Sequence, residues 1–256
     1  MNWKTFYAML SRDGHVARRN LLPTLMQNLL QPLLLTFVFG RVLTSGGMMQ
    51  GSYKNVLLPG IISISMVLSG VWAVAMPLIS EFQFTKEIED RLLAPMATQW
   101  LAVEKVVAGM IQAIVSGIVV IPAAYLMMGS GANLSFAHPL QFLAVCFLIA
   151  FLAAAGGLTL GCSIGQAHIG LMFSLIIAPM IMFGCVYYPW SFLKAFPVLQ
   201  YVVLINPLVY ATEGLRGTLV PQIPHIPIPA IIAALVVMDL VLLVVGLNRF
   251  NKKAVS

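Results

Sequence analysis

Few side chains in this 256-residue sequence could carry acid–base, nucleophilic or metal chemistry, because only 9% of its residues are charged. The four histidines lie far apart in the sequence: His15, His138, His168 and His225. No H-E-x-x-H pattern occurs, and no second Cys or His stands at metal-ligand spacing from any cysteine. All three cysteines lie in apolar runs, where we interpret them as small packing residues: Cys146, Cys162 and Cys185. The sequence therefore predicts neither a catalytic centre nor a metal site.

The first charged segment covers residues 81–104 and holds five of the eight acidic residues: Glu81, Glu87, Glu89, Asp90 and Glu104. Ile88 and Leu92 lie four residues apart and share one face of a helix. Glu87 and Arg91 can pair at the same spacing on another face. A short amphipathic element with both signs of charge is suited to docking a soluble protein. The alternative is a solvated loop whose charges only keep it out of lipid.

The second polar segment covers residues 206–217 and lies between apolar neighbours. Within it, Glu213 and Arg216 are three residues apart and can pair on one helix face. An isolated charge at membrane depth is costly, so mutual neutralisation is favoured. The pattern predicts short helices that dip into the membrane and pack against the spans.

Asp239 is the only acid inside a predicted membrane span. A functional interpretation makes it a proton or cation site in the membrane. Alternatively, the acid contacts a neighbouring helix, or its own helix is displaced toward the membrane interface. The alternative is favoured because no cationic partner is evident within the spans.

Composition indicates the class of protein that must position these groups. Hydrophobic residues make up 60% of the chain and the mean hydropathy is +0.96. A soluble domain carries roughly 25% charged residues. The composition therefore excludes a soluble enzyme, a disordered chain and a disulfide-stapled secreted module, and it predicts an integral membrane protein in contact with lipids. The net charge of +6 does not indicate nucleic-acid binding, because the cations form no patch with interleaved aromatics.

Apolar runs and their breakers predict an all-α polytopic membrane protein, a single domain of residues 1–256 with six transmembrane helices. The predicted spans are residues 21–43, 56–79, 106–128, 140–160, 169–188 and 230–247. Residues 1–20 carry Trp3, Phe6, Tyr7 and Leu10 at helical spacing, which predicts an amphipathic helix in the membrane interface. The alternative is a solvated leader before the first span. The proline-rich residues 189–228 are predicted to form an outer region before the sixth span.

The distribution of Lys and Arg predicts that both termini are cytoplasmic. With six crossings, ten of the 14 cations lie on the side of the termini and four on the opposite side. Cytoplasmic loops carry the excess of Lys and Arg in membrane proteins. Residues 81–104 are therefore predicted to be cytoplasmic, and residues 189–228 to lie outside.

Three motifs together resemble a known family. They are Glu87-Ile88-Glu89-Asp90-Arg91-Leu92-Leu93-Ala94-Pro95 followed by Lys105, then Leu58-Pro59-Gly60, and finally Asn206-Pro207 with Tyr210, Glu213, Leu215, Arg216 and Gly217. This combination is similar to the permease family of ABC type-2 exporters, the membrane subunits of drug, antibiotic, glycolipid and nodulation-factor efflux systems. The similarity covers essentially the whole chain in order and spacing. One departure is that the family often has a Gly-Thr pair just before the Leu-Glu part of its loop, which is not found here.

The resemblance implies a homodimer of this subunit bound to two copies of a separate nucleotide-binding ATPase. That partner would bind ATP and magnesium, and this chain would bind no cofactor. The family's coupling helix would correspond to residues 87–93, its connecting helix to residues 3–19 and its outer re-entrant helices to residues 191–217. The resemblance also implies a bacterial inner-membrane location and export of an amphipathic or lipid-linked substrate such as a drug, lipid or glycolipid. The chain contains no G-x-x-x-x-G-K-[ST] loop, which agrees with a partner that supplies the nucleotide site.

Two other classes of function stay open from the residues alone. An ion-coupled secondary transporter or channel would use Asp239 as its ion site. A membrane-embedded enzyme would have only Glu213, Arg216 and His225 as polar groups, without a nucleophile–base pair at a recognisable spacing. The exporter hypothesis is favoured because the charged segment and the missing phosphate loop both point to a separate ATPase.

Overall fold

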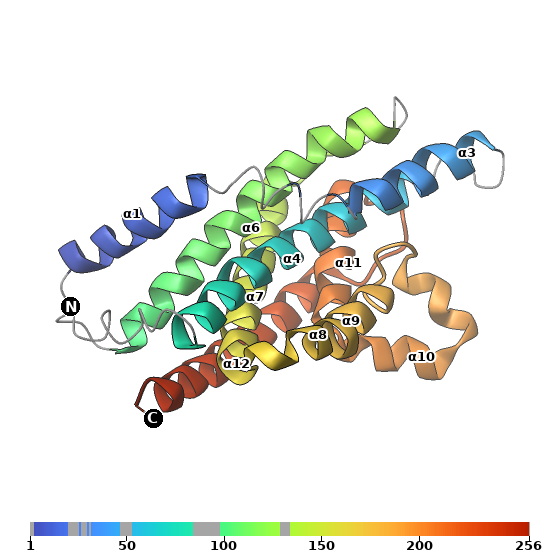
Figure 1. Ribbon diagram of the computed structural model, residues 1–256. Helices are drawn as coiled ribbons and strands as arrows, with labels where there is room; N and C mark the ends of the chain where they lie inside the picture. Colours follow the sequence, from blue (N-terminus) through green and yellow to red (C-terminus); the bar gives the residue numbers. More distant parts are fainter. Residues whose placement is uncertain are drawn as a thin grey trace.

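The computed structural model describes residues 3–19, 26, 30, 32–46, 53–83, 98–128 and 134–255, which form a helical bundle without a strand among them (Figure 1). Four long apolar helices make up most of the bundle: α4 (Tyr53–Gln83), α6 (Thr98–Met128), α7 (Pro139–Ser163) and α12 (Ile228–Val255). Each is long enough to cross the roughly 30 Å hydrocarbon core of a bilayer. The all-α membrane class predicted from composition is therefore confirmed.

The predicted first and fifth spans correspond to shorter apolar helices. Pro32–Ser45 covers the predicted first span from residue 32 onward, and Gln166–Met182 covers most of the fifth. The first contains the π-helix η1 (Val38–Val42) and α3 (Leu43–Ser45). The second contains η2 (Gln166–His168), α8 (Ile169–Met172), the π-helix η3 (Phe173–Ile177) and α9 (Ala178–Met182). The structure thus offers four long spans, or five if the bent pair Pro197–Ile205 and Pro207–Leu219 counts as one.

Helix α4 occupies the centre of the bundle and α12 its periphery. In α4, 78% of its most apolar 18-residue stretch is buried, whereas in α12 only 22% of the corresponding stretch is buried. Small residues let α7 approach α4 at backbone distance, because a Cβ atom at Gly157 would lie 2.7 Å from the carbonyl oxygen of Val71. A Cβ at Gly161 would lie 2.9 Å from the Cα of Ala75. The outward face of α12 keeps Val237, Leu240, Val241 and Val244 exposed, as a lipid-facing helix does.

One end of the bundle collects the features that the charge pattern assigns to the cytoplasm. The start of α1 (Trp3–Arg19), the end of α4, the start of α6 and the end of α12 lie at this end (Figure 1). Helix α1 packs along α6, with Met9, Leu10 and Asp13 partly buried and Tyr7 largely exposed. We call this region, with the charged side chains that it contains, the α1 end of the bundle.

Residues 189–228, which the charge pattern predicts to lie outside, contain short helices, as the polar pattern predicted. They are η4 (Trp190–Ala195), α10 (Pro197–Val202), η5 (Val203–Ile205) and α11 (Pro207–Leu219). The chain bends by 99° between Pro197–Ile205 and Pro207–Leu219. Prolines stand at the starts of α10 and α11, where the missing backbone N–H has no helical partner to lose.

Among the boundaries that differ from the sequence-based expectation, two involve polar or strained residues. Helix α6 begins at Thr98, so Glu104 and Lys105 are buried helical residues instead of the end of a loop. The fifth helix ends at Met182, before Gly184 and Cys185, and Cys185 has a φ of 53° that no α-helix allows. In both cases, contacts with other helices stabilise the observed boundary, which local hydropathy does not indicate.

Candidate functional site

A fully buried ion pair lies on α11. Glu213 Oε1 accepts a hydrogen bond from the Arg216 guanidinium, and neither side chain is exposed. The pairing predicted from their i, i+3 spacing is thus present in the structure. Burying two charges together is costly, and further hydrogen bonds to the remaining donors and acceptors offset part of that cost. The neighbouring backbone supplies three of these bonds, whereas Glu213 Oε2 and Arg216 Nε have no partner among the described residues.

Three chain segments meet at this pair. Arg216 donates to the carbonyl oxygen of Cys185 at 2.9 Å and, at 3.4 Å, to that of Val56 in α4. Glu213 Oε1 also accepts from the backbone N–H of Trp190 at 3.0 Å. The pair therefore joins α11 to the first turn of α4 and to the turn that follows the fifth helix.

The turn at residues 183–190 is shaped around α11. Cys185 occupies the left-handed backbone region, which costs a non-glycine residue energy and is found where the surroundings enforce it. The result is a carbonyl group directed at Arg216. One residue earlier, the carbonyl oxygen of Gly184 accepts from Thr212 Oγ1 at 2.8 Å.

Asn206 fixes the start of α11. Its Oδ1 accepts from the backbone N–H of Leu208 at 3.0 Å, which caps the helix. Its Nδ2 donates to the carbonyl oxygen of Met180 at 2.7 Å, so the same side chain holds α9 against α11. Pro207 follows as the first helical residue.

The other residues singled out in this segment have packing positions. Tyr210 is partly buried beside the cluster that contains Leu235 and Ile231. Gly217 faces the ring of His225 closely, since a Cβ there would lie 2.6 Å from its Cδ2. The Nδ1 of His225 hydrogen-bonds the carbonyl oxygen of Ile223 at 2.8 Å. Glu213, Arg216 and His225 are thus engaged in structural contacts, and the membrane-enzyme alternative gains no support.

A second polar cluster lies at the α1 end of the bundle and was not foreseen. Lys105 Nζ lies 2.8 Å from Glu81 Oε1 in the last turn of α4 and 2.6 Å from Asp13 Oδ2 in α1. The one available signal was Asp13, a lone acid in an otherwise basic amphipathic helix. We call Asp13, Glu81 and Lys105 the Lys105 cluster.

The predicted coupling residues lie outside the described residues. They are Glu87, Ile88, Glu89, Asp90, Arg91, Leu92 and Leu93, and they remain a prediction. The structure describes the two helix ends that flank them. Near the first of these ends, the rings of Phe82 and Phe250 pack edge-on with 5.7 Å between their centroids. The Nζ of Lys253 lies 4.7 Å from the centroid of the Phe82 ring. The last turns of α4 and α12 are therefore joined.

A family model described as ABC-2 type transporter matches residues 4–220. The match extends from α1 through α11 and thus includes both polar clusters and the charged segment between α4 and α6. This chain belongs to the ABC-2 type transporter family. Its members are membrane transport proteins that generally work with a partner ATPase.

Two curated proteins illustrate the relationship. The chain is 25% identical over 218 residues to the inner membrane transport permease YadH of Escherichia coli strain K12. The aligned part is 84% of this chain and 82% of YadH. The permease of the same name from Shigella flexneri matches with the same identity and coverage.

In this ABC-2 transporter, Asp239 lies beyond the family match and is 1% exposed in α12. Neither carboxylate oxygen has a hydrogen-bond partner within the described part of the chain. Helix α12 packs chiefly against α7, whose residues 139–163 include no charged side chain. The same described residues contain no group of three or more His, Cys, Asp or Glu that could hold a metal ion.

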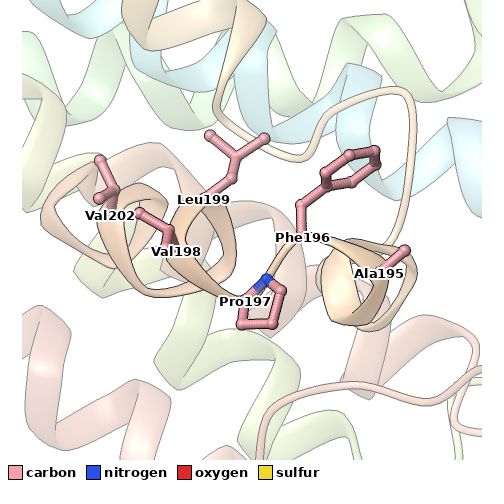
Figure 2. A pocket seen from close by; sticks show the side chains of 6 residues that line it. All are labelled: Ala195, Phe196, Pro197, Val198, Leu199 and Val202. Carbon is pink, nitrogen blue, oxygen red and sulfur yellow. The ribbon is translucent and has the colours of Figure 1, made fainter.

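Residues 189–228 carry an open apolar hollow (Figure 2). Its lining comes from the end of η4, from α10 and from the turn between them: Ala195, Phe196, Pro197, Val198, Leu199 and Val202. Neighbouring Phe192, Tyr201 and Ile205 are also exposed. This surface is therefore apolar and open.

Proposed function

We propose that this chain is the membrane subunit of an ATP-driven ABC exporter in a bacterial inner membrane. It would move an amphipathic or lipid-linked substrate out of the cytoplasm or the inner leaflet. The observation that carries the proposal is the α1 end of the bundle, where α1, α4 and α6 meet at the Lys105 cluster, next to the helix ends that lead into the charged segment. The chain itself contains no phosphate-binding loop. The family match and the name of the YadH relatives support it.

The proposed architecture has six crossings in a single domain, with both termini in the cytoplasm. The four long helices supply four crossings, and Pro32–Ser45 and Gln166–Met182 belong to the first and fifth. Residues 87–93 act as the coupling helix, α1 as the connecting helix and residues 189–228 as the outer re-entrant region. The location of α1 beside α6, and of the ends of α4 and α12 with it, supports this orientation (Figure 1).

The proposed assembly is a homodimer with two ATPase subunits. Helices α4 and α7 touch at backbone distance in the centre of one subunit, so a substrate path is better placed between two subunits. Closure of the ATPases around ATP favours one arrangement of the spans, and the substrate's access changes with that arrangement. The apolar outer surface suits an amphipathic substrate more than a polar polysaccharide chain.

Co-purification tests this function directly. The tagged chain is produced in the bacterium in which it naturally occurs and extracted in mild detergent. The proteins bound to it are then identified and counted. We expect a nucleotide-binding protein in a ratio of two copies to two permeases, together with ATP hydrolysis that vanadate inhibits. Gradient-driven transport by the purified chain alone, with no ATPase bound, would contradict the proposal.

The alternative is an ion-coupled secondary transporter or channel that uses Asp239. The observation in its favour is the burial of that carboxyl group without a hydrogen-bond partner among the described residues. The absence of a nearby cation or ligand cluster in the described helices weighs against it.

A further inference from the structure

Lys105 connects three helices at the α1 end of the bundle. Its Nζ contacts Asp13 of α1 at 2.6 Å and Glu81 of α4 at 2.8 Å. The side chain of Lys105 is 4% exposed, that of Glu81 9% and that of Asp13 16%. Charge pairs shielded from water are screened much less than surface pairs. These contacts therefore hold the three helices in one geometry.

An apolar cluster lies around the same three helices. Leu78 of α4 and Leu101 of α6 belong to one buried cluster, and Met9 of α1 packs against it. Phe250 of α12 is buried in the cluster too. Helix α1 is thus attached by apolar packing as well as by the Asp13–Lys105 ion pair.

The Lys105 cluster joins the two helices that flank residues 84–97. Glu81 lies in the last turn of α4, before those residues, and Lys105 lies in α6, which begins at Thr98 after them. A force on residues 84–97 reaches the bundle through these two helix ends. Because one ammonium group holds both ends and α1, the three helices cannot respond separately.

We propose that Lys105 is a positioning residue for energy coupling, which makes α1, the end of α4 and the start of α6 move as one body when the partner ATPase pushes on residues 84–97. This inference rests on the proposed function, because it requires an ATPase that acts at that segment.

Hydrogen–deuterium exchange on the permease–ATPase complex in lipid nanodiscs tests this role. Exchange is compared between the nucleotide-free complex and the complex trapped with ATP and vanadate. In the wild type, the peptides that cover α1, the end of α4 and the start of α6 should change together.

Three variants separate the connections. Asp13→Asn should weaken the nucleotide response of α1 and leave those of α4 and α6, whereas Glu81→Gln should weaken the response of α4 relative to the other two. Lys105→Met should uncouple all three, and Lys105→Arg should retain their common response. Residues along a coupling network typically contribute a factor of about 2 to 30, so the nucleotide-dependent ratio of α1 exchange rates should fall by that factor in Asp13→Asn. Lys252→Met, at an exposed lysine of α12, is the matched control and should behave as the wild type.

The outcomes are distinguishable. If α1 of Asp13→Asn responds to nucleotide as in the wild type, the positioning role of the cluster is refuted while the proposed function stands. If no ATPase accompanies the wild-type chain, the proposed function and the coupling role fail together. The structural cluster is then judged by nucleotide-free exchange, which Asp13→Asn should raise in α1 and Lys252→Met should not. Should Lys105→Met fail to fold, Asp13→Asn alone decides, since Asp13 is the most exposed member of the cluster.

Discussion

The guanidinium of Arg216 donates a hydrogen bond to the carbonyl oxygen of Cys185 at 2.9 Å, and Cys185 has a φ of 53°. A buried charge on one element thus coincides with a strained backbone on another. The strained turn supplies an acceptor that a relaxed helix end would direct elsewhere. This relationship joins α11 to the end of the fifth helix.

Loss of either charge of the buried pair should destabilise the protein strongly. Arg216→Met leaves Glu213 buried without its partner, and such changes cost about 3–5 kcal/mol. Thermal unfolding in detergent measures the effect. The double variant Glu213→Gln/Arg216→Met should recover much of the loss, because no buried charge then stays unpaired. A double variant no more stable than Arg216→Met would refute this account.

The backbone at Cys185 should prefer glycine. Cys185→Ala removes the thiol and keeps the left-handed strain, while Cys185→Gly removes both. The difference between these two variants isolates the backbone, and glycine should be more stable by about 1 kcal/mol. Thermal unfolding of the two proteins side by side checks this, and alanine equal to glycine would mean that the turn carries no strain.

Arg91→Glu, or deletion of residues 87–93, should uncouple ATP turnover from transport. The reason is that this charged segment is proposed to receive the motion of the ATPase. Vanadate-sensitive ATP hydrolysis and export of Hoechst 33342 are measured together in everted vesicles. Arg249→Glu, at an exposed arginine of α12, is the matched control and should keep the wild-type ratio of transport to hydrolysis. An unchanged ratio in the deletion variant would remove the assigned role.

Asp239→Asn should leave ATP-dependent flux intact and create no dependence on an ion gradient. Proteoliposomes with the ATPase complex, assayed with and without ATP and a proton gradient, separate the two modes of transport. If the wild type shows gradient-driven flux without ATP and Asp239→Asn abolishes it, the ion-coupled alternative replaces the exporter.

Asp239→Leu should stabilise the fold. A buried polar group without a hydrogen bond costs about 1–3 kcal/mol, and leucine removes that cost at a site that is 1% exposed. Thermal unfolding in detergent is the measurement, with Val237→Leu on the exposed face of α12 as the control for hydrophobicity. A destabilised Asp239→Leu would indicate that the carboxyl group has a favourable partner in the assembled transporter.

The sequence by itself determined the membrane class, the approximate helices and the Glu213–Arg216 pair. The reason is that these features depend on local patterns. A bilayer requires long apolar helices whose backbone groups bond internally, and an i, i+3 pair is created by the helix that carries it. The same reasoning placed short helices in the outer region before the last span.

Only the tertiary structure decided which distant groups meet. Lys105 pairs with Asp13, 92 residues away in sequence, and Arg216 bonds to Cys185, 31 residues away. Hydropathy assigned Glu104 and Lys105 to the edge of a loop, because a charged residue in isolation belongs in water. The bundle instead buries Lys105 within α6, since helices α1 and α4 bring two carboxylates to it. Contacts between elements have no periodic signature in one sequence, so packing alone revealed this cluster.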